Sequence, residues 1–206
     1  MMRITLSDTG KRFNRDWIFR HLTYEFLPGQ SYAITGPNGS GKSTLLQIIS
    51  AGMAQSEGTI AWHNNKTSID ADDVFKSISI AAPYLEVIEE MTAIEFLHFH
   101  HQFKKLLPDI SIKEIISLIG LEKAASKQIR YFSSGMKQRI KLAQAIFSDV
   151  PLLLLDEPCT NLDAAGYELY HNLITGYGKG RTIIVSSNDV NEYSFCGEII
   201  TITDFK

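Results

Sequence analysis

Residues 133–163 read SSGMKQRIKLAQAIFSDVPLLLLDEPCTNLD, and this stretch decides the fold. A Ser-Ser-Gly turn precedes a basic helix, which we expect over Gly135–Phe147 because apolar residues recur there at helical spacing. After a short spacer comes an apolar strand, Leu152–Asp156, with Glu157 directly behind it. A short apolar run of this kind is typical of a buried strand in a parallel sheet.

A second stretch, GPNGSGKST at 36–44, matches the pattern G-x-x-x-x-G-K-[ST] at every fixed position. It lies between an expected strand, Ser31–Thr35, and an expected helix, Lys42–Ser50, as that pattern requires. The glycines let backbone N–H groups surround an anion, and the helix dipole adds to the positive field. The expected phosphate-binding residues are Gly36, Pro37, Asn38, Gly39, Ser40, Gly41, Lys42, Ser43 and Thr44.

The two stretches also predict catalytic and metal-binding roles. Lys42 is expected to reach the β- and γ-phosphates of a nucleotide, and the Ser43 hydroxyl to bind Mg²⁺. Asp156 and Glu157 end a strand at the edge where ligands bind in open α/β sheets. We expect Asp156 to hold Mg²⁺, directly or through water, and Glu157 to polarise the attacking water.

Strands and helices alternate along most of the chain, which favours a mostly parallel sheet. Further strands are expected at Arg3–Leu6, Leu22–Phe26, Gly58–Trp62, Ser77–Ala82, Thr182–Ser187 and Glu198–Thr203, the early ones as an antiparallel edge. Further helices are expected at 92–107, 111–120 and Ala164–Leu173, with Gly52 and Gly120 as stops and capping boxes at Thr92/Glu95 and Ser111/Glu114. The predicted fold is α/β, one domain over 1–206 with a helical subdomain inserted at about 84–135.

Composition restricts the partners of the chain. Its 206 residues carry 20 basic and 23 acidic side chains, a net charge of −3, which argues against nucleic acid as the main partner. Cys159 and Cys196 are too few for a disulfide framework, so a reduced compartment and buried thiols are expected. No apolar run approaches the ~20 residues of a membrane helix. His98 and His101 share a helix face without further ligands, which argues against a metal site there.

Taken together, the motifs resemble the nucleotide-binding domain of ABC (ATP-binding cassette) proteins over essentially the whole chain. GPNGSGKST is similar to Walker A, and LLLLDE to Walker B with its catalytic Glu. FSSGM at 132–136 resembles the signature motif, usually LSGGQ, and Asn161-Leu162-Asp163 resembles the D-loop. The resemblance implies a P-loop NTPase core that hydrolyses ATP with Mg²⁺.

In that family two domains pair head to tail, and each ATP lies between the Walker motifs of one and the signature of the other. The resemblance therefore implies that Ser133 and the Gly135 backbone contact the γ-phosphate held by a second nucleotide-binding domain. An aromatic residue near the end of the first strand usually stacks on adenine. Phe13 fits that place, with Trp17 as second choice, although Phe13 could also be a core residue.

Two positions depart from the family. The Gln that usually ends the strand before the helical insert is absent, and its position falls near Pro83. Glu86, Glu89 or Glu90 could replace it as a water-mediated metal ligand, or could be solvated acids. Asn188 stands where the family usually has a His that senses the γ-phosphate. Asn can donate a hydrogen bond but cannot carry a positive charge, so hydrolysis is expected to be slow.

The resemblance implies the ATPase subunit of a transporter, peripheral on the cytoplasmic face of the membrane and bound to separate transmembrane permease subunits. The short form is similar to haem-exporter and drug-exporter ATPase subunits. The region Pro83–Phe99, with Tyr84, Leu85 and Phe96, is the expected docking surface. Two alternatives stay open: a soluble ABC-type ATPase, and a slow-hydrolysing ATP-dependent regulator.

Overall fold

The computed structural model describes residues 2–64 and 67–206, which form two compact units. Unit 1 contains the chain up to Ile78, together with Val150–Glu157 and Gly180–Lys206. Unit 2 contains Ser79–Asp149 and Pro158–Lys179. Each unit is therefore built from segments that are distant in sequence.

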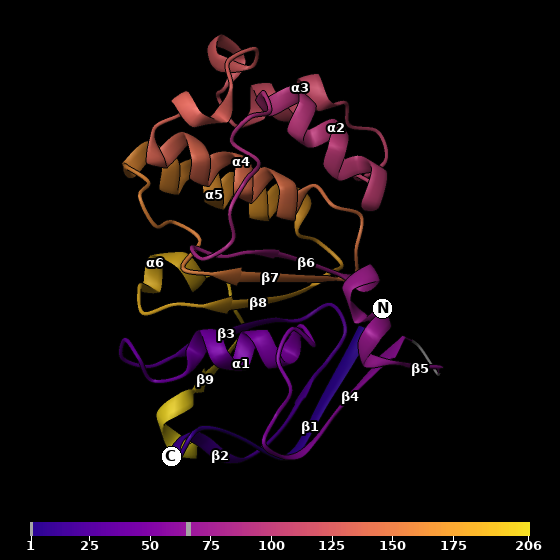
Figure 1. Cartoon of the computed structure of the whole chain (residues 1–206), viewed down its shortest axis with the longest axis vertical. Helices are drawn as coiled ribbons and strands as arrows, with labels where there is room; N and C mark the ends of the chain where they lie inside the picture. Colours follow the sequence, from indigo (N-terminus) through magenta and orange to yellow (C-terminus); the bar gives the residue numbers. More distant parts are fainter. Residues whose placement is uncertain (1, 65–66) are drawn as a thin grey trace. The chain divides into compact units, whose positions relative to one another are not determined.

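A parallel sheet forms the centre of unit 1 (Figure 1). Its strands run in the order β7 (Leu152–Asp156), β8 (Thr182–Ser186), β3 (Ser31–Thr35) and β9 (Glu198–Thr201), and neighbouring strands are parallel. Every residue of β7 and β8 is buried, as expected for a sheet covered on both faces. Because parallel strands end at one edge, the segments that follow β3, β7 and β8 emerge together.

The first strands form a second, antiparallel sheet in the order β2-β1-β4-β5. These strands are β1 (Met2–Phe13), β2 (Asp16–Phe26), β4 (Glu57–Asn64) and β5 (Thr67–Ile69). The prediction that these early strands pair antiparallel is confirmed, and the structure adds that they make a sheet of their own. The strands were predicted too short. The paired strands β1 and β2 continue through register shifts between Leu6 and Arg12, where polar residues interrupt the alternation of apolar and polar side chains.

Aromatic side chains join the antiparallel sheet to the parallel sheet and to helix α1 (Lys42–Ile49) in unit 1. The rings of Phe26 and Tyr32 meet edge to face with centroids 4.9 Å apart, and Trp62 Nε1 donates to the Ile49 carbonyl at 2.8 Å. Ile49 ends helix α1, after which Ala51 takes the left-handed conformation at φ +58. The predicted stop at Gly52 was thus wrong by one residue. Three short elements of this unit were not predicted: η1 (Ala71–Ser77), α6 (Val190–Tyr193) and η4 (Ile202–Phe205).

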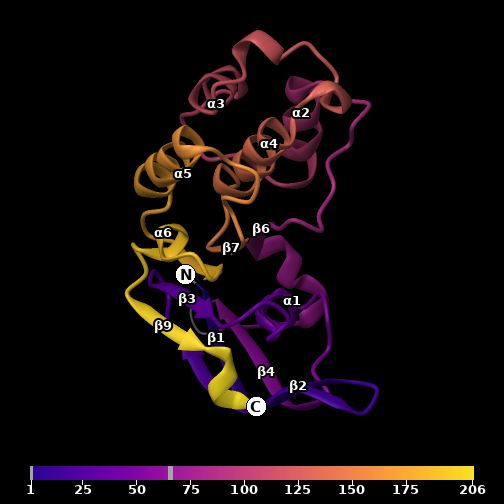
Figure 2. The same cartoon turned by 90° about the vertical axis from the view of Figure 1, so that its left-hand side faces the viewer.

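Unit 2 is mainly helical. Its four helices are α2 (Ala93–Phe103), α3 (Ile112–Leu118), α4 (Ser134–Ile146) and α5 (Ala164–Tyr177), with short turns η2 (Glu122–Ala124) and η3 (Ile129–Tyr131). Strand β6 (Ile78–Ala81) leads into it. Helices α4 and α5 lie side by side in both views (Figure 2). The rings of Phe147 and Tyr177, which follow α4 and end α5, contact each other with centroids 4.7 Å apart.

The starts of α2 and α3 were predicted correctly. The Thr92 hydroxyl accepts from the Glu95 N–H, and the Glu95 carboxylate accepts from the Thr92 N–H, while Ser111 and Glu114 repeat the arrangement. The end of α2 was predicted four residues too late.

After Phe103 the backbone N–H groups of Leu106 and Leu107 form hydrogen bonds outside the helix. The Leu106 N–H donates to His101 Nδ1 at 3.1 Å, and the Leu107 N–H donates to the Phe147 carbonyl at 2.8 Å. These contacts replace the next helical hydrogen bonds. Gly120, at φ +68, follows α3 as predicted.

Candidate functional site

Residues 36–44, here called the phosphate loop, connect β3 to α1. Gly36, Gly39 and Gly41 have φ angles of +144, +76 and +110, a range that favours glycine. Helix α1 begins at Lys42 without a side-chain cap, so its first N–H groups are available to an anion. The loop therefore has the backbone form that a phosphate cradle needs.

Lys42 binds two backbone carbonyls of the phosphate loop through its side chain. Its side chain is buried, and its ammonium donates to the carbonyls of Gly36 at 2.8 Å and Pro37 at 3.3 Å. A buried cation held by neutral carbonyls is well placed to receive a negatively charged ligand. Buried Ser40 Oγ has no hydrogen-bond partner within the described residues.

A cavity of about 190 Å³ opens on this loop within unit 1. It is lined by Ile18, Asn38, Gly39, Gly41, Lys42, Ser43, Thr44 and Glu157. We call it the phosphate-loop cavity. The structure therefore brings together Glu157 and most of the predicted phosphate-binding residues around one cavity. Ile18 was not predicted; a Cβ on Gly41 would lie 2.4 Å from its Cγ2 atom, so this contact requires glycine.

The two carboxylates lie where the sequence predicted them, at the end of β7. Asp156 is 1% exposed, and its Oδ1 atom has no hydrogen-bond partner in the described part of the chain. A buried carboxylate oxygen without a donor fits a cation, and carboxylate and hydroxyl oxygens are ligands that Mg²⁺ prefers. Glu157 has φ +43 and its N–H donates to the Ser186 carbonyl at 2.8 Å.

Asn188 lies in the segment after β8 and reaches the phosphate loop. Its Nδ2 atom donates to Asn38 Oδ1 at 2.8 Å. Both residues were predicted as site residues, but their contact was not. Nothing in the spacing of two asparagines 150 positions apart predicts it.

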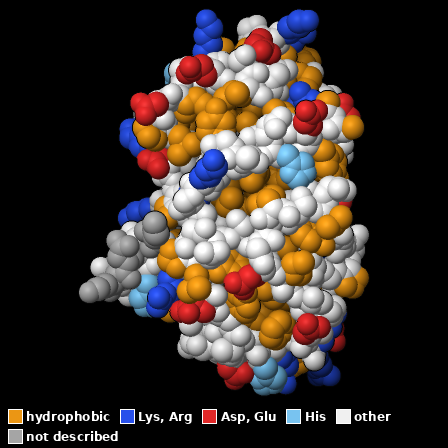
Figure 3. Space-filling model, turned by 180° about the vertical axis from the view of Figure 1, so that it is seen from behind, with side chains coloured by type: hydrophobic (Ala, Val, Ile, Leu, Met, Phe, Trp, Pro, Cys, Tyr) orange, Lys and Arg blue, Asp and Glu red, His pale blue; other side chains and the backbone are white. Residues whose placement is uncertain are grey.

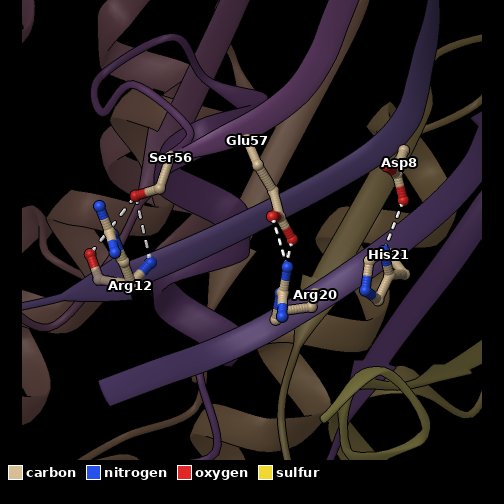
Figure 4. Close-up of polar contacts among 6 residues, drawn as sticks. All are labelled: Asp8, Arg12, Arg20, His21, Ser56 and Glu57. Atoms are coloured by element: carbon tan, nitrogen blue, oxygen red, sulfur yellow. Dashed lines mark hydrogen bonds and ion pairs between the residues drawn. The ribbon is translucent and has the colours of Figure 1, made fainter. Parts of the chain in front are cut away.

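The expected adenine-stacking residue ends β1. Phe13 is 44% exposed, with the Lys11 ammonium 5.2 Å from its ring centroid, so Phe13 is a surface residue rather than a core one. The guanidinium groups of Arg12 and Arg20 lie 5.6 and 4.1 Å from the Trp17 ring centroid. Figure 4 shows that Glu57 holds the Arg20 guanidinium, whereas Ser56 accepts a hydrogen bond from the backbone N–H of Arg12. Because the Trp17 ring contacts two cations and Phe13 only one, and because Phe13 is the more exposed of the two, Phe13 is the better candidate for stacking.

The signature-like turn lies in unit 2. Ser133 is the N-cap of α4, and its hydroxyl accepts from the Met136 N–H at 3.3 Å. Asp163 caps α5 by accepting from the Gly166 N–H at 2.9 Å. A Cβ on Gly135 would lie 3.1 Å from the Asn161 carbonyl, so the signature and D-loop segments touch.

A second cavity, of about 610 Å³, opens on this turn, and we call it the signature cavity. It is lined by Gly120, Leu121, Glu122, Lys123, Ala124, Ser133, Ser134, Gly135, Met136, Arg139, Asn161, Leu162 and Asp163. The residues given for the signature cavity belong to unit 2, and those given for the phosphate-loop cavity belong to unit 1.

The residues proposed to replace the missing Gln are exposed in unit 2. Glu89 forms an ion pair with Lys137 of α4, and the Pro83 carbonyl accepts from Lys141 Nζ at 3.2 Å. Glu86 and Glu90 are exposed as well. A metal-binding role for the three glutamates stays a prediction.

His100 and His101 make hydrogen bonds within unit 2, and the two cysteines differ in burial. His100 Nε2 lies 2.8 Å from Ser148 Oγ, and His101 Nδ1 accepts the Leu106 N–H. Cys159 is buried as predicted, whereas Cys196 is partly exposed, and desolvation raises the pKa of its thiol to about 12.

A glycine-rich loop between a parallel strand and a helix, with an acidic residue at the end of a neighbouring strand, defines a P-loop nucleotide-binding protein. The family model described as "ABC transporter" matches residues 19–160. The chain belongs to this family, and it is an ATP-binding cassette with an ATPase fold.

Individual relatives agree with this assignment. The chain is 33% identical over 186 residues to the uncharacterized ABC transporter ATP-binding protein YybJ of Bacillus subtilis, covering 90% of this chain and 85% of that one. It is 31% identical to the cytochrome c biogenesis ATP-binding export protein CcmA of Mesorhizobium japonicum, covering 90% and 91%. A dimeric structure of a bacterial ABC transporter cassette shares the fold, with TM-score 0.80 and 24% identity over 97% of this chain and 94% of that one.

Proposed function

We propose that this chain is the ATP-hydrolysing subunit of an ABC transporter, which closes head to tail with a second nucleotide-binding domain and drives separate membrane subunits. The observation that carries the proposal is the buried Asp156 oxygen without a donor among the described residues, next to Glu157 at the phosphate-loop cavity. A cation site beside a phosphate cradle and a carboxylate is the arrangement that phosphoryl transfer to water requires.

Each residue then has a definite task. Lys42 exchanges its two carbonyl partners for phosphate oxygens, and the loop N–H groups hold the same anion. Asp156 and Ser43 hold Mg²⁺, which offsets the charge of the phosphate oxygens when it is bound. Glu157 orients and polarises the attacking water, and Phe13 stacks on the adenine, a contact worth about 1–3 kcal/mol.

A second copy, or a related domain, supplies the other half of the site. Ser133 is exposed on the signature cavity, and its cap bond uses only the hydroxyl oxygen as an acceptor. Its O–H can therefore donate to a γ-phosphate held by the partner, as can the Gly135 N–H. A head-to-tail pair brings a signature cavity to each phosphate-loop cavity, and ATP then holds the pair together.

Docking to membrane subunits is supported by exposed apolar side chains in unit 2. Tyr84, Ile88, Ile94 and Phe99 are between 36% and 45% exposed, whereas Phe96 is 5% exposed and was wrongly expected at this surface. None of the helices within residues 2–64 and 67–206 is long and apolar enough to cross a membrane. Export is supported by the name of the relative CcmA.

The net charge of −3 and the face shown in Figure 3 give nucleic acid little support as a partner. On the face shown in Figure 3, lysines and arginines are scattered among acidic and hydrophobic side chains instead of forming one basic patch. A nucleic-acid-binding surface would concentrate the basic side chains on one face.

The test uses Glu157→Gln protein, which should bind ATP without hydrolysing it. With ATP and Mg²⁺ it is expected to run as a dimer in size-exclusion chromatography and to capture a multi-span membrane protein from detergent-solubilised membranes. The control is Glu157→Gln combined with Lys42→Ala, which removes the phosphate contact and should stay monomeric. Capture of soluble partners alone would contradict the transporter role and favour a soluble ABC-type ATPase.

A slow ATP-dependent regulator is the second candidate, and the engagement of Asn188 by Asn38 favours it. An amide in this position cannot act as a charged sensor of the γ-phosphate. Single-turnover hydrolysis by the wild type and by Glu157→Gln separates the candidates. A wild type that is no faster than the variant would support the regulator.

A further inference from the structure

We infer that Asn188 is a positioning residue that acts through Asn38 to hold the phosphate loop in its binding conformation before nucleotide arrives. This inference rests on the proposed function. It differs from the family expectation, in which the residue at this position contacts the γ-phosphate. The observation that carries it is the hydrogen bond from Asn188 Nδ2 to Asn38 Oδ1, 2.8 Å long, between two exposed side chains of unit 1.

The backbone that carries Asn188 is fixed on both sides. The Ser187 N–H donates to the Ile34 carbonyl of β3 at 3.1 Å, and the Asp189 N–H donates to Ser187 Oγ at 2.9 Å. The Asp189 carboxylate in turn accepts from the Asn191 N–H at 2.9 Å and caps α6. Asn188 is therefore presented from a rigid turn that is anchored to the strand leading into the phosphate loop.

Asn38 lies on the opposite side of the contact, at the outer part of the loop. The inner part is held by Lys42, whose ammonium binds the carbonyls of Gly36 and Pro37, and by the Ser40 N–H, which donates to the Pro37 carbonyl at 3.0 Å. Gly39 follows Asn38 with φ +76, and a Cβ added to it would meet no described atom within 4 Å, so the loop is open to solvent there. The Asn188 amide is thus the contact that ties the outer part of the loop to the turn after β8.

Amide chemistry allows this role to coexist with ATP binding. A side-chain amide has two N–H donors, and the contact with Asn38 uses one of them. The loop is then already ordered when the nucleotide binds, so less conformational entropy is lost on binding. One hydrogen bond at an exposed site supports an effect of about two- to tenfold on affinity.

ADP separates positioning from γ-phosphate sensing, because ADP has no γ-phosphate. The dissociation constants of ADP and ATP with Mg²⁺ would be measured by calorimetry for the wild type, Asn38→Ala, Asn188→Ala and the double variant. Asn172→Ala, an exposed asparagine on α5, is the matched control. Hydrogen–deuterium exchange of residues 36–44 in the nucleotide-free proteins and thermal unfolding temperatures complete the set.

We expect each single variant to bind ADP about two- to tenfold more weakly, the double variant to be no weaker than either single one, and exchange in the loop to be faster in all three. Unfolding temperatures should match those of the control. Additive losses, or a loss for ATP alone with unchanged exchange, would overturn the inference. If the wild type binds no nucleotide, the proposed function fails, while the exchange measurement still decides whether Asn188 orders the loop.

Discussion

Arg20 donates two hydrogen bonds to Glu57, from Nε and Nη2 to the two carboxylate oxygens, each 2.8 Å long (Figure 4). Arg20 belongs to β2 and Glu57 to β4, and β1 lies between them in the sheet. The two side chains meet over Gly10 of β1, which pairs with Glu57. A Cβ on Gly10 would lie 2.5 Å from Glu57 Oε1, so this ion pair requires glycine beneath it.

Replacing Gly10 by Ala should therefore displace Glu57 and separate it from Arg20. We expect a loss of about 1–3 kcal/mol in the free energy of unfolding, the usual cost of an added methyl group without space. Urea denaturation measures it. Gly176→Ala is the control, because no described atom lies within 4 Å of its Cβ position and helical glycine is unfavourable by roughly 0.5–1 kcal/mol. If Gly10→Ala changes the free energy of unfolding by the same amount as Gly176→Ala, the contact with Glu57 does not matter.

A methyl group on Gly41 should abolish nucleotide binding more completely than one on Gly39. Both residues have positive φ, which costs alanine of order 1 kcal/mol or more, but only at Gly41 would the new Cβ also collide with Ile18, at 2.4 Å. We expect Gly41→Ala to weaken ATP binding by at least about 100-fold and Gly39→Ala by about tenfold. Calorimetric titration with ATP and Mg²⁺ tests the order, and the reverse order would contradict the role of Ile18.

Local signals explain which parts of the fold were predictable. The capping boxes at Thr92 and Ser111 depend on residues three positions apart, and both were predicted correctly. The end of α2 depends on the contact of Leu107 with Phe147, forty positions away, and was predicted wrongly. For the same reason the sequence did not show that β1 and β2 belong to a separate sheet, since pairing is set by distant partners.

The candidate site divides in a similar way. The phosphate loop and the carboxylates of β7 follow a fixed spacing, so Lys42, Asp156 and Glu157 could be predicted from residues alone. The contact of Asn188 with Asn38 could not, because it depends on how the turn after β8 is held against β3. Resemblance predicted that position 188 matters, but only the geometry shows what Asn188 touches.

Acid should destabilise unit 2 through His100. Desolvation lowers the pKa of this partly buried imidazole to about 4. The Ser148 hydroxyl donates to the Gln144 carbonyl at 2.6 Å, so its oxygen can accept from His100 Nε2–H. In the unfolded chain the pKa is about 6.5, so the unfolded state binds more protons between the two values. The contribution of His100 to the free energy of unfolding is therefore complete above pH 6.5, and it is lost as the pH falls towards 4.

We expect this loss to be about 1–2 kcal/mol, after allowance for partial solvent exposure. Urea denaturation at pH 7 and pH 5 measures it, and His100→Gln should remove most of the dependence. His98→Gln is the control, because His98 is exposed on the same helix. If the wild type and His100→Gln lose the same stability on acidification, other groups are responsible.

Asn188→His should raise the rate of ATP hydrolysis, by up to about 100-fold, the lower end of what a positioned general acid or base contributes. Imidazole can carry a positive charge near the γ-phosphate, which an amide cannot. Steady-state phosphate release measures the rate, and Asn188→Ala controls for loss of the contact with Asn38. An unchanged rate in Asn188→His would show that Asn188 does not limit turnover. If the histidine variant also binds ADP as the wild type does, the gain in rate does not come from a change in how the phosphate loop is held.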